Sequence, residues 1–183
     1  LLQSEKCMFV DSTFFTIFSF PLIEHSNTDV LNTNNGVILT ESFAKSLFGN
    51  ENLLGHKVLL NNRVSYLITG VAKDFDERTH FANPDIILPF TSLTNFFGEN
   101  YLKQFDMQFF LSGLYVLSKP KVDMKERSDL LLDKVKSWYW LFQDGRSTSL
   151  AFKPLKEVYF NPAKFSFGEG IRSGNNVQII LIY

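Results

Sequence analysis

Residues 37–76 constrain the fold more than any other stretch, because they hold a strand, a helix and a hairpin pattern in close succession. Residues 37–39 form a short apolar run that predicts a strand. The hydroxyl of Thr40 is suited to cap a helix N-terminus, and Gly49 favours the positive φ at which helices end. Between them, four apolar residues recur at helical spacing: Phe43, Ala44, Leu47 and Phe48. The stretch therefore begins with a strand and a helix.

Two further strand patterns follow at residues 56–60 and 64–71. Asn61 and Asn62 tolerate positive φ and predict a two-residue turn between these strands. The second run alternates large apolar with other side chains, which predicts a strand with one buried face. No known catalytic motif falls in this helix-plus-hairpin unit, which points away from an enzyme.

The chain is rich in phenylalanine, with 20 among 183 residues and a hydrophobic content of 45%. That length and content suit one domain or two small ones with a real core. An aromatic-rich core is one interpretation of the phenylalanines, and a patch that faces a partner is the other.

Charge and cysteine content exclude several classes of protein. The net charge is −1 and the sequence has no basic run, so we expect no nucleic-acid partner. The single cysteine, Cys7, excludes a disulfide within the chain. No apolar run reaches the roughly 18 residues of a membrane span. The abrupt start and the apolar run at residues 177–183 suggest a piece cut from something longer, with a natural buried terminal strand as the alternative.

The remaining patterns predict a mixed fold. In the first half they indicate a strand at 7–10, a short helix over Phe14, Phe15 and Phe18, an exposed loop at 24–36, a strand at 85–90 and a short helix at 92–97. Later they indicate strands at 108–117 and 150–160 around a helix at 123–142, which together form a βαβ-type unit. Asp123 and Glu126 have capping-box spacing, and Trp138 falls on the apolar face of that helix. Residues 164–176 are rich in Gly and Ser and are expected to be mobile.

Candidate chemistry is sparse. Asp74, Asp76, Glu77 and His80 lie close in sequence, but their spacing fits neither a calcium loop nor a zinc signature. We expect local bonds to loop amides from Asp74, Asp76 and Thr79 instead. Cys7 has no supporting motif with His25, His56 or His80. We therefore predict no catalytic residue, no metal ligand and no cofactor.

Several strings occur in a characteristic order over most of the chain. They are DSTFFTIFSFPL at 11–22, VILTESFAKSLFGNE at 37–51, LGHKV at 54–58, TGV at 69–71, DF at 74–75, HF at 80–81, KPLKEVY at 153–159 and GNNV at 174–177. As a set they resemble the MacB-like periplasmic core domain of FtsX-type ABC transporter permeases, in the form abundant in Bacteroidetes.

The resemblance implies an α+β fold with two subdomains. One is a porter-like α/β subdomain, assigned to residues 1–13 plus 101–183. The other is an inserted, small mixed α/β lobe known as Sabre, assigned to residues 14–100. It also implies a periplasmic domain of an inner-membrane protein, placed between two membrane helices, with both ends on the side near the bilayer.

The implied function is that of a non-catalytic mechanical relay and docking surface for export or efflux. Its implied partners are the flanking transmembrane helices, a cytoplasmic ATPase domain or subunit, and a periplasmic adaptor or cargo. The isolated domain is expected to be a monomer. A free-standing periplasmic module that binds a peptide or lipid in a Phe-lined pocket is the alternative, and a small hydrolase, a third hypothesis, has no motif behind it.

Overall fold

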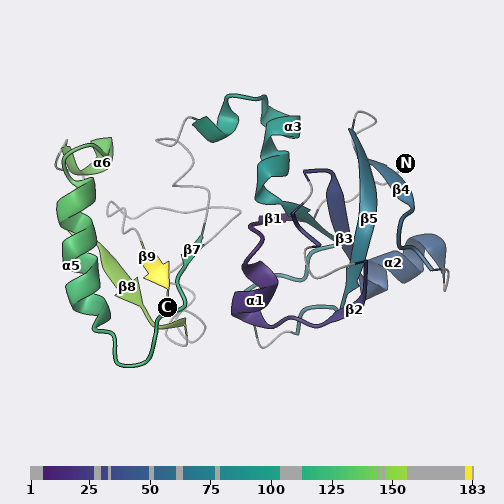
Figure 1. The fold of residues 1–183 in the computed structure, drawn as a ribbon, viewed down its shortest axis with the longest axis horizontal. Coiled ribbons are helices and arrows are strands. Elements are labelled where there is room, and N and C mark those ends of the chain that lie inside the picture. Colours follow the sequence, from purple (N-terminus) through teal and green to yellow (C-terminus); the bar gives the residue numbers. More distant parts are fainter. Residues whose placement is uncertain are drawn as a thin grey trace. The chain divides into compact units, whose positions relative to one another are not determined.

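The structure, a computed structural model, describes residues 6–26, 30–32, 34–49, 52–60, 64–76, 79–103, 113–143, 145, 147–155 and 180–182. It divides into two compact units, Leu1–Lys103 and Gln104–Tyr183, each with its own sheet (Figure 1).

Unit 1 is built on a six-stranded mixed sheet. Its strands are β1 (Cys7–Val10), β2 (Leu22–His25), β3 (Gly36–Thr40), β4 (Lys57–Leu60), β5 (Val64–Ala72) and β6 (Ile86–Pro89). They lie in the order β1-β6-β3-β5-β2, and β4 also pairs with β5. The β1–β6 and β3–β5 pairs are parallel, whereas β3–β6, β2–β5 and β4–β5 are antiparallel. The predicted α+β class is confirmed, since helices cover a sheet of mixed direction.

Alternating side chains of the central strands supply two separate cores, as the period of a strand requires. Val37 and Leu39 of β3 belong to the first core, and Ile38 belongs to the second. Helix α2 (Glu41–Phe48) and helix α3 (Leu93–Phe97) pack on the first core. Helix α1 (Phe14–Phe18) packs on the second core. A 3-10 turn at Phe90–Ser92 leads into α3, and another covers Tyr101–Lys103.

A bulge in β5 lets both of its halves serve the first core. Val37 pairs with Ile68 but the next residue of β3 pairs with Gly70, so Thr69 is the extra residue. The Thr69 hydroxyl donates to the carbonyl oxygens of Val30 at 2.8 Å and Val37 at 3.3 Å. Because the bulge shifts the alternation by one, Ile68 and Val71 both face the first core.

Gly70 marks a close approach of two strands. A Cβ atom at this position would lie 3.1 Å from the backbone oxygen of Glu24 in β2, which is tighter than most real contacts. Glycine therefore lets β2 pair closely with β5.

One sequence prediction in unit 1 was wrong in part. The expected exposed loop at 24–36 begins inside β2, and it carries Val30 and Leu31, which are buried. Leu60 pairs with Val64, as expected of a hairpin. The predicted turn at Asn61 and Asn62 lies outside the described part of the chain.

Six phenylalanines pack on one another against the second core. Phe20 and Phe75 stack with ring centroids 4.0 Å apart, and Phe18 meets Phe81 edge-on at 4.9 Å. Phe14 contacts five other phenylalanine rings at centroid distances between 5.1 and 6.2 Å. We call this set the aromatic cluster: Phe14, Phe15, Phe18, Phe20, Phe75 and Phe81. Its members are buried or partly buried, which supports the core interpretation for these residues.

Unit 2 contains a parallel three-stranded sheet in which β9 (Ile180–Ile182) lies between β7 (Leu114–Tyr115) and β8 (Ala151–Lys153). The predicted strand–helix–strand unit is thus present, although β9 separates its strands. Residues 108–112 and 156–160 of the predicted strands, and 164–176, lie outside the described residues.

The helix predicted at 123–142 is two helices, α5 (Met124–Val135) and α6 (Trp140–Gln143). Asp123 caps α5 as expected, accepting from the amides of Lys125 and Glu126. Since α5 ends at Val135, the helical period does not determine which way the side chain of Trp138 points. Trp138 is 53% exposed, which corrects its predicted core position, whereas Tyr139 is 2% exposed and packs with Leu150.

The two compact units divide after Lys103, and β1 pairs with β6 inside unit 1. The subdomain assignment from the resemblance, residues 1–13 plus 101–183 against 14–100, stays a prediction. The porter-like and Sabre-like identities of the two units stay predictions. The predicted position of both chain ends concerns residues 1–5 and 183, which the structure does not describe.

Replacing Phe14 by Ala should lower the free energy of unfolding by about 3–5 kcal/mol, because a buried ring at the centre of the aromatic cluster is lost. Phe97 is the matched control, since it lies in the same unit and is 61% exposed. Phe97→Ala should cost less than about 1 kcal/mol, mostly its stacking on Tyr101. Urea unfolding of both variants measures the difference, and equal losses would contradict this account of the core.

Candidate functional site

The N-terminus of α2 is capped by a residue far away in sequence. Asp74 accepts hydrogen bonds from the amide of Ser42 at 3.3 Å and from its hydroxyl at 2.8 Å. Thr40 has the expected N-cap backbone, but its hydroxyl donates to the carbonyl of Asp85 at 3.4 Å. The predicted capping role of the Thr40 side chain was therefore wrong, and the carboxylate of Asp74 takes it over, where the helix dipole favours negative charge.

Asn83 holds this capping loop in place. Its amide nitrogen donates to Asp74 at 3.5 Å, and its side-chain oxygen accepts from the amide of Phe75 at 2.8 Å. The segment after β5 is thus tied to α2 on one side and, through Phe75, to the aromatic cluster on the other.

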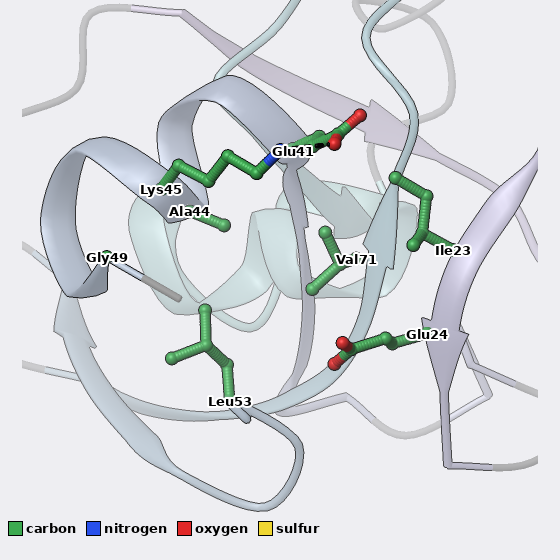
Figure 2. Close-up of a pocket in the computed structure, with 8 residues that line it drawn as sticks. All are labelled: Ile23, Glu24, Glu41, Ala44, Lys45, Gly49, Leu53 and Val71. Carbon is green, nitrogen blue, oxygen red and sulfur yellow. Dashed lines mark hydrogen bonds and ion pairs between the residues drawn. The ribbon is translucent and has the colours of Figure 1, made fainter. Parts of the chain in front are cut away.

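A pocket of about 160 Å³ opens beside α2, between that helix and β2 (Figure 2). Its apolar lining comes from four residues: Ile23, Ala44, Leu53 and Val71. Ala44, Leu53 and Val71 belong to the first core, so the base of the pocket is an extension of that core. Gly49 also lines the pocket, and the charged residues of the described lining are Glu24, Glu41 and Lys45.

Lys45 and Glu41 form an ion pair one helical turn apart on the α2 wall (Figure 2). The Nζ of Lys45 lies 2.6 Å from Oε1 of Glu41, and this hydrogen bond raises the pKa of Lys45 above its ordinary value. The orientation, with the acid N-terminal to the base, is the favourable one on a helix. The charge of Glu41 is therefore compensated within the wall itself.

Glu24 forms the opposite wall. It is exposed, and β2 holds it through pairing with Val71. Figure 2 shows its carboxylate directed away from β2, toward the side of the pocket where Leu53 lies. Among the described residues its side chain has no hydrogen-bond or ion-pair partner. The pocket thus combines an apolar base, one neutralised wall and one free carboxylate.

The residues considered for a metal site have other roles. Asp74 caps α2, and His80 packs against Phe81 with ring centroids 4.0 Å apart. Thr79 accepts from the amide of Phe81, as predicted for this loop. Glu77 lies outside the described residues. Within the described part of the chain, no group of three or more His, Cys, Asp or Glu residues is arranged to hold a metal ion.

Cys7 and the histidines of unit 1 are dispersed. Cys7 is exposed on β1, at one edge of the sheet, and His25 is on β2, four strands away. At the usual strand spacing that separation is about 19 Å. His56 precedes β4, which pairs with the β2 side of β5. His80 packs with the aromatic cluster, on the face opposite the side chains of Cys7 and Phe9.

Sequence reasoning missed the pocket. The spacing of Glu41 and Lys45 in the sequence is that of a helical ion pair and could have indicated one wall. Glu24, in contrast, lies in a segment that was predicted to be a loop. Only the pairing of β2 with β5 places that carboxylate opposite α2.

The model of the family "MacB-like periplasmic core domain" matches residues 3–132. The chain belongs to this family. It is a periplasmic domain of a MacB-like ABC transporter permease, as the sequence motifs indicated. Comparison with curated proteins gives no match.

Solved structures that are similar include three domains of transporters or permeases. A domain of a putative permease protein from Porphyromonas gingivalis has 18% identity and a TM-score of 0.50, over 69% of this chain and 56% of that one. The periplasmic region of MacB from Actinobacillus actinomycetemcomitans has 20% identity and a TM-score of 0.48, over 73% and 56%. The extracellular domain of the noncanonic ABC-type transporter YknZ from Gram-positive bacteria has 20% identity and a TM-score of 0.41, over 54% and 53%. This chain therefore spans just over half the length of the structures it matches.

Among the described residues, no helix combines the length and the apolar character required to cross a membrane.

Asp74→Ala should lower the free energy of unfolding by about 0.5–2 kcal/mol, because the amide of Ser42 loses its cap. Thr40→Val should cost less than this, since the amide of Thr40 still donates to the carbonyl of Asp85. Thermal or urea unfolding of the two variants decides between the caps. A larger loss of unfolding free energy for Thr40→Val than for Asp74→Ala would instead support the Thr40 cap predicted from the sequence.

Burial lowers the pKa of His80, so the folded chain disfavours the protonated form. As the pH falls through the ordinary histidine value of about 6.5, the unfolded chain takes up a proton that His80 resists in the fold. Stability should fall in that range and level off below the lowered pKa. The loss between about pH 7.5 and 5.5 should be smaller for His80→Phe, which keeps the ring but cannot titrate. Equal losses in both proteins would show that His80 does not contribute.

Proposed function

We propose that this domain works without catalysis, as a mechanical relay and a docking surface on the periplasmic side of its permease. In this proposal a cytoplasmic ATPase drives the flanking membrane helices, and the domain carries their motion to an adaptor or a cargo. The observation that carries the proposal is the family match over residues 3–132.

The packing of unit 1 supports the relay. A relay has to move as a body, and the central strands of this sheet are packed on both faces. Ile38, Leu39 and Ile87 are fully buried, and the bulge at Thr69 ties β5 to β3 and to Val30. Interiors packed in this way have low compressibility and transmit strain.

The separation of Cys7 from the histidines supports a non-catalytic role. A thiol nucleophile needs its base within hydrogen-bond reach. His25 lies at the other edge of the sheet from Cys7, and His80 packs on the other face.

The alternative, a free-standing binding module with a Phe-lined pocket, has less support. The aromatic cluster fills its own interior, with ring contacts such as Phe20–Phe75 at 4.0 Å. Among the described residues, no phenylalanine lines the pocket beside α2.

The relay can be tested in the full-length permease, reconstituted in lipid with its ATPase. Cys7 is exposed and is the only cysteine of this chain, so it accepts a spin label once cysteines elsewhere are removed. Leu117→Cys gives a second label site in unit 2, where the native side chain is well exposed. We expect the distance between these labels, or between the Cys7 labels of two copies, to change between the nucleotide-free and ATP-bound states.

A label pair inside unit 1, at Cys7 and Phe97→Cys, is the control and should keep one distance in all nucleotide states. Active ATP hydrolysis without a change in either test distance would contradict the relay.

A further inference from the structure

The pocket beside α2 is asymmetric in charge. Glu41 is bound to Lys45 at 2.6 Å, so this wall presents a closed ion pair. Glu24 on the β2 wall has no partner among the described residues. The described lining residues include two carboxylates and one ammonium, so among them one negative charge, that of Glu24, is not compensated.

The base of the pocket is apolar and continuous with the first core. Ala44, Leu53 and Val71 are buried there, and Ile23 adds an exposed aliphatic side chain next to Glu24. A ligand that fits must therefore offer an aliphatic stem and a positive head. Lys and Arg side chains have this construction, since their methylene stems lie on apolar surface while the charged head stays near water.

We propose that this pocket receives the Lys or Arg side chain of a partner polypeptide, with the stem on Val71 and Leu53 and the head on Glu24. The inference deepens the proposed docking role and rests on it. An anion is disfavoured because Glu24 faces the opening. A purely apolar group would fill the base but would bury part of the free carboxylate without a partner, which costs free energy.

The size of the pocket favours a side chain over a whole ligand. With a volume of about 160 Å³ the pocket covers only part of a bound polypeptide. The rest of the partner must lie across the rim of the pocket, where the lining residue Ile23 is 48% exposed. A polypeptide supplies such flanking contacts, whereas a small free amine does not.

Nuclear magnetic resonance titration of the 183-residue chain tests the proposal. The cationic probes are lysine amide and arginine amide, each acetylated on the α-amino group so that the side-chain charge is kept. The α-acetylated amide of norleucine is the neutral analogue, and spermidine is the free polyamine. We expect weak but saturable shifts at the amides of Ile23, Ala44 and Val71 with both cationic amino-acid probes. The neutral analogue should bind about two- to five-fold more weakly, the effect of one exposed charge pair.

Glu24→Lys is the decisive variant, because it places a like charge where the head should lie. It should weaken binding of the cationic probes at least about ten-fold. Glu99→Lys is the matched control, since Glu99 is an exposed acid of the same unit outside the pocket, and it should change binding less than about two-fold. Ile23→Ala should weaken both cationic probes through lost stem contact while the fold stays intact.

Three outcomes overturn the inference: no saturable shift, equal effects of Glu24→Lys and Glu99→Lys, or tighter binding of spermidine than of the amino-acid probes. None of these outcomes bears on the spin-label distances, which test the relay separately. An ATP-dependent distance change without probe binding would leave the relay standing and remove this docking pocket. Probe binding without a distance change would do the reverse.

Discussion

The bulge at Thr69 is the constraint on which unit 1 depends. If Thr69 took an ordinary place in the ladder, Val71 would point to the face opposite Ile68, and the first core would end halfway along β5. With the bulge, β5 pairs with β4 through its first half and with β2 through its second, while β3 lines its other edge. The Thr69 hydroxyl secures the irregular point by bonding two carbonyls. The base of the pocket, which includes Val71, and the position of Asp74 beside α2 both depend on the register that this bulge gives to β5.

Local patterns in the sequence were enough for most elements of unit 1. Residues 37–49 read as a strand, a helix and a glycine stop, and the structure agrees, with Gly49 at a φ of 68°. Tyr66 and Ile68 are buried as the alternation of β5 predicted. These features depend on neighbours in the chain, which is why periodicity finds them.

What sequence reasoning missed depends on partners far along the chain. The cap of α2 comes from Asp74, which is 32 residues away from Ser42. Strand β2 is short and polar, and only its pairing with β5 makes it a strand. The predicted burial of Trp138 was wrong for a different reason. Its assignment extended a helical period past Val135, and beyond a helix end that period no longer says which side chain is buried.

Gly70 has a consequence for how the pocket can vary. Its missing side chain lets the backbone of Glu24 come close on the face of Val30 and Ile38, away from the pocket. A methyl group there would push β2 outward and carry the Glu24 carboxylate with it. The size of residue 70 thus controls how closely β2 approaches β5, and through this the distance of Glu24 from α2 across the pocket. A substitution at that residue would change the proposed site without altering any of its lining residues.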